Sequence, residues 1–227
     1  MSTAVARSRI TTVGDLIESL GDIPLDRVRL DPPPGQATEA DLLRLSAADG
    51  RLYELVDGTL VEKPMGWKEA SLATWLARLF HPYLSDNDLG ELIGADGTHH
   101  LRQDHICLPD LAFVLWENVP PDDELAPIPD LTPDLAVEIL SPSNTLKEMA
   151  RKRTEYFRAG TSLVWQVNPE KKTVEVFTSP TRSKLLGVGD TLDGGSLLPG
   201  FCLPLSVLFA PRGGKKRGTA RRRKPKG

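Results

Sequence analysis

The sequence predicts a single α/β domain. Its 227 residues, 40% of them hydrophobic and 26% charged, suit one globular unit that can bury a substantial core. Short apolar or alternating runs, bounded by Gly, Pro and Asn, are typical of strands. Longer segments with apolar residues three or four positions apart are interspersed with them and are typical of amphipathic helices.

We expect residues 1–49 to form an N-terminal arm of helical and extended segments, beginning with about ten disordered residues. Residues 13–21 have helical spacing, and Gly21 is a natural stop. The three consecutive prolines that follow make residues 26–38 extended. A second helix is predicted from a cap at Thr38 to Gly50.

Residues 51–64 are the clearest β-hairpin, with two alternating runs on either side of Asp57-Gly58. Glu54 lies on its first strand. An amphipathic helix is predicted over residues 65–84, with Glu69 in its first turn. Glu69 has two interpretations, which are a favourable interaction with the helix N-terminus and a carboxylate beside a metal site.

Residues 89–110 are interpreted as two strands with a turn near Asp96-Gly97. This segment contains His99, His100 and His105. Two adjacent histidines on a strand point to opposite faces, and no cysteine or further histidine stands at ligand spacing. We therefore interpret the three as surface histidines and not as a zinc site.

Two apolar strands, predicted over Leu108–Trp116 and Asp134–Ser141, each carry a carboxylate in an unexpected place. Asp110 lies near the start of the first, and Glu138 lies inside the second. A Glu in a buried strand is rare unless it is paired or binds a metal. Two such carboxylates with a nearby lysine can bind a divalent cation and activate water for phosphodiester hydrolysis.

The remaining segments complete the predicted sheet. Ser143 or Asn144 is expected to cap a helix that runs to Gly160, and residues 161–179 form a hairpin through Asn168-Pro169. The segment between the two carboxylate strands is a loop rich in prolines and acids. Residues 180–211 are expected to add short strands and a final turn over the core.

Five sequence blocks occur here in one order: YELVDGTLVEKP, LPDLAFV, DLAVEILSPSNT, KRTEYFRAG and LVWQVNPEKKTVEVF. In this respect the chain resembles the Uma2 family of restriction-endonuclease-like proteins, over roughly residues 50–208. Asp110 and Glu138 on adjacent strands before a helix also resemble the core of the PD-(D/E)xK nucleases. The resemblance implies a restriction-endonuclease-like fold, with one curved mixed sheet flanked by helices, and we assign it to residues 50–211.

The resemblance also implies a Mg²⁺-dependent DNA endonuclease, with Mn²⁺ as an alternative metal. Asp110 and Glu138 would hold the metal. The motif's usual lysine position is Leu140 here, and Lys152 on the following helix matches the lysine that is thought to have migrated in this family. The other interpretation of Lys152 is an exposed helix charge. Glu54 and Glu69 would be additional acidic residues, although Glu54 also fits the open face of the hairpin.

The alternative function is a catalytically weak nucleic-acid-binding or interaction module that keeps the nuclease fold. Leu140 favours this alternative, whereas Asp110, Glu138 and Lys152 favour the enzyme. Restriction-type nucleases often act as pairs of active sites, so the resemblance also suggests a homodimer.

The net charge of −3 conceals an asymmetry. Residues 212–227 contain nine Lys and Arg and no acid, so the remainder carries 19 basic and 31 acidic residues, a charge of −12. We expect a disordered basic tail that attracts DNA phosphates, or a merely solubilising one. The candidate nucleic-acid-binding residues are Lys215, Lys216, Arg217, Arg221, Arg222 and Arg223.

The sequence also bears on the compartment. It contains no apolar run of about 18 residues and no secretory signal pattern, so we expect no membrane association. Cys107 and Cys202 stand far apart without metal spacing, and Cys107 is interpreted as strand packing. A cytoplasmic, reduced protein is the resulting prediction.

Overall fold

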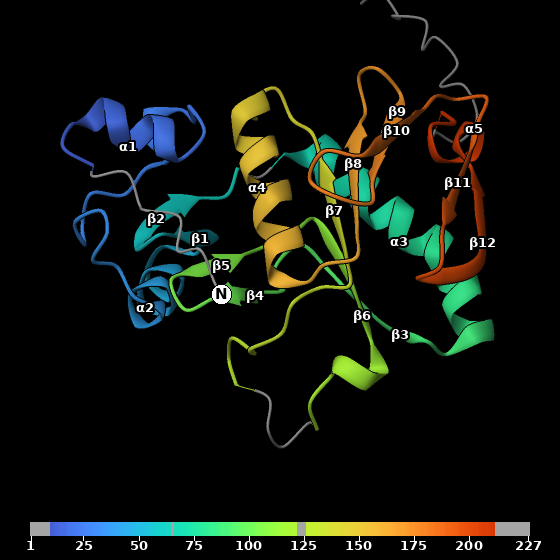
Figure 1. Cartoon of the computed structure of the whole chain (residues 1–227), viewed down its shortest axis with the longest axis horizontal. Helices are drawn as coiled ribbons and strands as arrows, with labels where there is room; N and C mark the ends of the chain where they lie inside the picture. Colours follow the sequence, from blue (N-terminus) through green and yellow to red (C-terminus); the bar gives the residue numbers. More distant parts are fainter. Residues whose placement is uncertain (1–9, 65, 122–125, 212–227) are drawn as a thin grey trace, which may run out of the picture.

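The computed structural model describes residues 10–64, 66–121 and 126–211 of the chain (Figure 1). The helical elements in this part of the chain are α1 (Val13–Ser19), η1 (Leu25–Arg27), α2 (Glu39–Asp49), α3 (Trp67–Asn87), η2 (Trp116–Asn118), α4 (Leu146–Ala159) and α5 (Leu205–Leu208). The strands are β1 (Tyr53–Val56), β2 (Thr59–Glu62), β3 (Gly90–Ile93), β4 (His99–Arg102), β5 (His105–Cys107), β6 (Leu111–Leu115), β7 (Leu135–Ile139), β8 (Leu163–Asn168), β9 (Thr173–Phe177), β10 (Ser183–Leu186), β11 (Thr191–Gly194) and β12 (Leu198–Pro204). The predicted single α/β domain is confirmed.

The central sheet has six strands in the order β10-β9-β8-β7-β6-β3. β7 and β8 pair in parallel, and the other neighbours pair antiparallel. The parallel pair requires a crossover, which α4 supplies. The sheet is therefore mixed, as the family resemblance implies.

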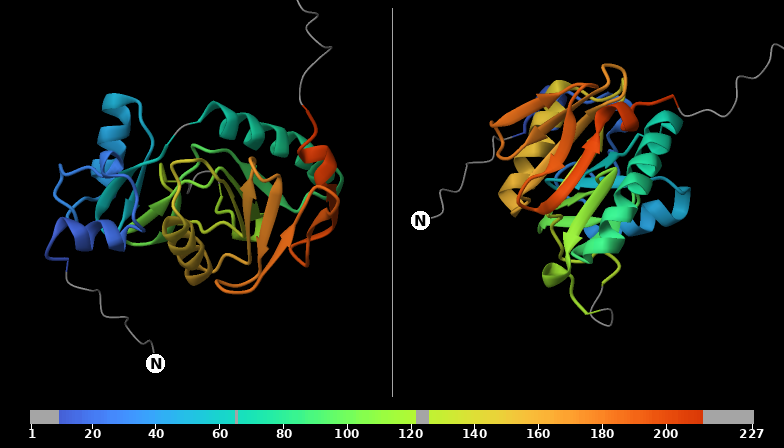
Figure 2. Two further views of the ribbon diagram at one scale, coloured as in Figure 1. Left: turned by 90° about the horizontal axis from the view of Figure 1, so that it is seen from above. Right: turned by 90° about the vertical axis from the view of Figure 1, so that its right-hand side faces the viewer.

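The two long helices cover opposite faces of this sheet (Figure 2). The odd-numbered residues of β7, Leu135, Val137 and Ile139, belong to the core that contains Leu76 and Phe80 of α3. Ala136 instead packs with Tyr156 of α4. Because strand side chains alternate between faces, Glu138 points to the α4 side.

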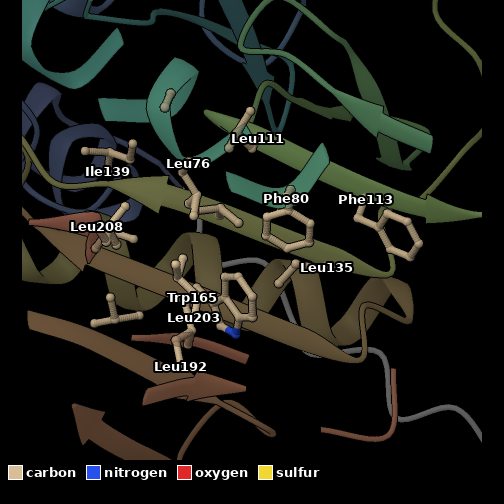
Figure 3. Packing of buried hydrophobic residues seen from close by; sticks show 14 of the residues in the cluster. Leu76, Phe80, Leu111, Phe113, Leu135, Ile139, Trp165, Leu192, Leu203 and Leu208 are labelled. Carbon is tan, nitrogen blue, oxygen red and sulfur yellow. The ribbon is translucent and has the colours of Figure 1, made fainter. Parts of the chain in front are cut away.

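The main core lies between α3, the central sheet and the β11-β12 pair (Figure 3). Phe80, Trp165 and Phe201 form its aromatic centre, and the rings of Phe80 and Phe201 stack with centroids 4.4 Å apart. Offset aromatic contacts of this kind add to the free energy that burial supplies. This packing fixes the position of β7, which carries Glu138.

A second sheet, in the order β2-β1-β5-β4, lies at the end of the molecule that also holds α1 and α2 (Figure 1). Tyr53 and Leu55 of β1 face α2, whereas Val56 faces α1. The N-terminal arm therefore covers one face of the hairpin with α1 and the other with α2. Thr38 caps α2 through a capping box, and Gly50 ends it with a φ of +69°, as the sequence predicts.

The predicted strand over Leu108–Trp116 is shorter in the structure. β5 ends at Cys107 and β6 begins at Leu111, and Trp116 starts η2. Pro109 has no backbone N–H for the ladder, so the chain passes from the four-stranded to the six-stranded sheet at this point. Asp110 consequently lies at the junction of the two sheets, immediately before β6.

Two other expectations need correction. Residues 89–110 form three strands and not two, because a further turn separates β4 from β5 and β3 joins the other sheet. Thr145, and not Ser143 or Asn144, caps α4, since its hydroxyl accepts a hydrogen bond from the backbone N–H of Glu148 at 2.9 Å.

The surface interpretation of the histidines is wrong for two of them. His99 is 1% exposed and His105 is 3% exposed, because both point inward from a sheet that is covered on two faces. His100 is partly buried and lies 3.2 Å from Glu39. Across residues 10–64, 66–121 and 126–211, no helix combines the length and the apolar character needed to cross a membrane.

Candidate active site

A small polar pocket lies where the two sheets, α4 and the start of α3 meet. Its volume is about 30 Å³. Its lining comprises Arg27, Glu54, Lys63, Pro64, Glu69, Asp110, Glu138, Ile139, Ser141, Asn144, Glu148 and Lys152. Five carboxylates and three cationic side chains line it, which leaves a formal charge of −2. Such a concentration of buried charge is rare unless the groups are paired or hold a ligand.

Lys152 bridges two strands from its position on α4. Its Nζ lies 2.8 Å from Oε1 of Glu138 on β7 and 2.9 Å from Oε1 of Glu54 on β1. All three side chains are at least 90% buried. The exposed-charge interpretation of Lys152 and the open-face interpretation of Glu54 are therefore wrong.

The position of Lys152 follows from helix geometry. Glu148, Lys152 and Tyr156 stand four residues apart, so they share one face of α4. The Tyr156 hydroxyl donates a hydrogen bond to Oε1 of Glu138 at 2.6 Å. Glu138 thus receives a hydrogen bond and an ion pair from two successive turns of the same helix.

Asp110 is held from two sides. Its Oδ2 accepts a hydrogen bond from the backbone N–H of Ile139 at 2.7 Å, and its Oδ1 lies 3.0 Å from Nζ of Lys63. Lys63 also donates to the carbonyls of Leu108 and Ala95, at 2.7 and 3.2 Å. These contacts fix Asp110 beside the end of β7, next to Glu138.

The electrostatics of the two glutamates differ. Burial alone would raise the pKa of Glu54, but Lys152 and then Lys63 lower it to about 2. Burial raises the pKa of Glu138 in spite of Lys152, and the charges of Asp110 and Glu54 raise it further. Burial opposes the charge of Lys152, yet Glu138 and Glu54 raise its pKa above the ordinary value. The pocket therefore holds a firmly charged lysine between an ionised carboxylate and one that protonates more easily.

The remaining acids differ in their pairing. Glu148 is ion-paired with Arg27 at 2.8 Å and accepts a hydrogen bond from Asn144 at 3.0 Å. Glu69 lies in the first turn of α3, where its carboxylate folds back over Gly66. Glu69 therefore lies at a helix N-terminus and also lines the pocket, so both of its interpretations stay open.

The sequence matches a family model over residues 39–206, which is most of the chain. The family is Uma2, described as "Putative restriction endonuclease". This chain belongs to the Uma2 family. The family resemblance that the sequence blocks indicate is thereby confirmed, and the pocket residues Glu54, Asp110, Glu138 and Lys152 all lie inside the matched segment.

A solved structure has the same fold as this Uma2 chain. It is the crystal structure of a "putative nuclease belonging to DUF820" from Anabaena variabilis, with a TM-score of 0.63 and 20% sequence identity. The alignment covers 70% of this chain and 90% of the other. The predicted restriction-endonuclease-like fold is therefore confirmed. A search of curated proteins found no match.

The structure brings together Asp110, Glu138, Lys152, Glu54 and Glu69, which the sequence singles out as site residues. It adds Lys63, Tyr156 and Arg27, which the sequence alone does not identify. One signal for Lys63 was available: it stands two residues after Val61, which pairs with Glu54 across the hairpin, so it shares the face of Glu54. The six candidate tail residues between Lys215 and Arg223 lie outside the described residues.

No group of three or more His, Cys, Asp or Glu side chains within the described residues is arranged to hold a metal ion. His99 and His105 are buried apart from the pocket, and neither lines it. The carboxylates of Asp110 and Glu138 each face a lysine instead. A metal here would therefore rest on two carboxylates, with water completing its coordination.

Proposed function

We propose that this Uma2 chain is a Mg²⁺-dependent DNA endonuclease that hydrolyses phosphodiester bonds. One observation carries the proposal: Asp110, Glu138 and Lys152, which come from separate elements, converge on one buried pocket in a nuclease-like fold. The family description supports DNA as the substrate. The retained acidic pair and lysine favour an enzyme over a passive binding module.

The residues present fit Mg²⁺. Asp110 accepts a hydrogen bond from the backbone N–H of Ile139, the residue after Glu138, and both carboxylates line one pocket, so both can approach one cation. Mg²⁺ is commonly bound by one or two carboxylates and keeps several waters, which suits this donor set. The formal charge of −2 in the lining equals in magnitude the charge that Mg²⁺ or Mn²⁺ carries. We assign Asp110 and Glu138 as the residues that would hold the metal.

The bound metal would lower the pKa of a water ligand and neutralise charge on the phosphate. Lys152 would orient the attacking water or stabilise the developing oxyanion, since it remains charged and is fixed between Glu54 and Glu138. Glu54 would hold Lys152 in place when Glu138 turns to the metal. Lys63 would orient Asp110, and Tyr156 would orient Glu138.

A plasmid-cleavage assay in Mg²⁺ or Mn²⁺ tests this proposal. The wild-type protein should nick or cut the plasmid, and Asp110→Ala should lose at least about a hundredfold in rate, because one of two metal ligands is removed. Asp86→Ala, at an exposed position on α3, is the matched control and should cleave like the wild type. Equal residual nicking by wild type and Asp110→Ala would indicate contamination and refute the enzyme for this substrate.

The alternative is a nucleic-acid-binding module that retains the fold without efficient catalysis. Leu140 at the usual lysine position favours it, as does the complete ion pairing of Asp110 and Glu138 without a metal. Calorimetric titration with Mg²⁺ separates the two. Metal binding that Asp110→Ala abolishes supports the enzyme, whereas DNA binding without metal binding supports the module.

We also propose a cytoplasmic location and no membrane partner. Both cysteines are free, Cys107 in the core and Cys202 at the surface. An exposed free thiol is compatible with a reducing compartment.

A further inference from the structure

Arg27 reaches the pocket from the N-terminal arm, outside the segment that matches the family. It lies at the end of η1 and is 7% exposed. Its Nε donates a hydrogen bond to the carbonyl of Glu62 at 2.9 Å, and its Nη2 pairs with Oε1 of Glu148 at 2.8 Å. Its other terminal nitrogen, Nη1, is buried and has no hydrogen-bond partner among the described residues. A buried donor without a partner is costly, so this nitrogen calls for a ligand.

The arm that carries Arg27 is firmly attached to the elements around the pocket. Asp22 pairs with Lys147 at 2.7 Å, and the carbonyl of Leu20 accepts a hydrogen bond from Nε of Arg151 at 3.2 Å. The Thr145 hydroxyl donates to the carbonyl of Gly21. These contacts join the arm to the first turns of α4, the helix that carries Lys152. Arg27 is therefore carried by a segment that is bonded directly to α4.

Arg27 stands between two hollows. It lines the acidic pocket and also an adjoining hollow of about 380 Å³, whose other lining residues are Pro24, Asp26, Arg51, Glu62, Pro64 and Ser143. Only Arg27 and Pro64 are common to both linings. A chain that passed from the larger hollow into the acidic pocket would therefore pass Arg27.

The chemistry of this position suits a phosphate. The planar guanidinium group presents donors in a fixed fork that matches phosphate oxygens, and here Glu148 fixes that fork through Nη2. Nη1 has no partner in the described part of the chain but is covered from solvent, so a phosphate would reach it only after the neighbouring side chains shift. The hydroxyl of Ser143, which shares a hydrogen bond with Ser141, and the guanidinium of Arg51, which pairs with Glu62 at 2.7 Å, also line this hollow.

We propose that Arg27 binds a backbone phosphate adjacent to the one that is cleaved, so that the N-terminal arm completes the active site. This inference rests on the proposed nuclease function. The ligand class is a phosphate group, whether on a nucleic-acid strand or as the free ion. Because the pocket lining carries a formal charge of −2, the phosphate should bind only when a divalent cation has neutralised the carboxylates.

The test is a titration of inorganic phosphate into the Mg²⁺-loaded protein, followed by NMR chemical shifts. A fluorescent 16-nucleotide DNA strand is titrated in parallel, with Ca²⁺ in place of Mg²⁺. The variants are Arg27→Gln and Arg27→Lys. Arg29→Gln is the matched control, because Arg29 lies on the same arm but pairs with Asp49 at the surface. Since Arg27→Gln leaves Glu148 buried and unpaired, Arg27→Gln/Glu148→Gln provides a neutral pair that is more certain to fold.

We expect the two Gln variants to bind phosphate and the DNA strand about tenfold more weakly than the wild type, or worse, from the loss of a charge-assisted hydrogen bond. Arg27→Lys should be intermediate, and Arg29→Gln should match the wild type. Unchanged affinity in both Gln variants would overturn the inference, as would a wild type that binds neither ligand. Plasmid cleavage by the same preparation reports separately on the nuclease. If phosphate binding depends on Arg27 but the plasmid is not cleaved, the subsite stands and the nuclease is refuted for this substrate. The titration with the DNA strand then distinguishes free phosphate from a strand as the ligand.

Discussion

Lys152 is a cation between two buried carboxylates, and its removal tests the pocket without an activity assay. Lys152→Met keeps the length of the side chain but leaves Glu54 and Glu138 unpaired in the interior. Breaking a buried ion pair in this way costs about 3–5 kcal/mol of unfolding free energy. Urea denaturation should show this loss as a lower midpoint with an unchanged slope.

A variant that lacks both the lysine and the two carboxylate charges is the control for this prediction. Lys152→Met combined with Glu54→Gln and Glu138→Gln has no unpaired charge at this position, so it should recover most of the lost free energy. A single variant as stable as the wild type would contradict the buried bridge between α4, β1 and β7.

His99 is predicted to make stability depend on pH. Its Nδ1 donates to the carbonyl of Leu131 at 3.2 Å, and burial lowers its pKa from 6.5 to about 4. Between these two values the unfolded chain binds the proton and the folded chain does not. Stability should therefore fall as the pH drops from about 6.5 to about 4, by about 3 kcal/mol for this residue.

His99→Gln removes this titration and is the variant to compare. The unfolding free energies of wild type and variant, measured by urea denaturation between pH 4 and 8, should converge toward low pH and separate toward neutral pH. Parallel curves would mean that His99 does not titrate differently in the folded and unfolded chains.

At the scale of elements, the contact between the arm and α4 depends on Gly21. Its φ is +90°, and a Cβ at this position would lie 2.5 Å from the backbone nitrogen of Glu148. Gly21→Ala therefore combines backbone strain with a clash against main chain that cannot move aside. We expect a loss of about 1–3 kcal/mol and faster amide exchange throughout α1, measured by hydrogen exchange.

Gly14→Ala is the matched control for this prediction. Gly14 lies inside α1, and its added Cβ would meet only the Thr12 hydroxyl at an ordinary 3.4 Å. Alanine is the better helix former, so this variant should be at least as stable as the wild type. Equal exchange rates in α1 for Gly21→Ala and wild type would refute the close approach.

Local patterns predict most of the elements, because alternation, caps and turn residues act over a few positions. Thr38 and Gly50 mark the ends of α2 correctly, and an isolated Glu in an apolar run identifies Glu138. The break at Pro109 arises because β5 and β6 join different sheets. The residues around it have the pattern of one continuous strand, so the sequence predicts a single strand there. Strand partners are set by long-range packing, which periodicity does not encode.

The candidate site shows the same limit, because local sequence patterns do not reveal contacts between distant segments. Asp110, Glu138 and Lys152 could be found from residue type and family resemblance. Arg27 could not, because nothing in its neighbourhood links it to Glu148, which lies 121 positions away. Tyr156 is similar, since an inward tyrosine on α4 is first of all a core residue.

At the scale of the whole molecule, the paired active sites of restriction-type nucleases predict a homodimer. Sedimentation velocity across concentrations should show a species of twice the chain mass at high micromolar protein. A strict monomer under these conditions would remove the prediction and leave an enzyme that nicks one strand at a time.

The charge of the chain bears on how it could approach DNA. Residues 1–211 carry a charge of −12, and a nuclease must nevertheless draw phosphates to an acidic pocket. Residues 212–227 supply nine Lys and Arg that can offset this repulsion. Deleting them should weaken DNA binding for all sequences alike, because such residues contact phosphates and not base edges.

The salt dependence separates this effect from a loss of folding. Each phosphate that the tail neutralises releases counterions, so the affinity of the full chain should fall more steeply with salt than that of the truncated chain. Binding curves for both chains across a salt series measure the two slopes. Thermal unfolding of the two chains should be alike, because Ala220 and Pro225 are the only apolar side chains that residues 212–227 offer for burial. Identical slopes would leave the tail without an electrostatic role on DNA, and Arg27 and the lysines of the pocket would then have to supply the attraction.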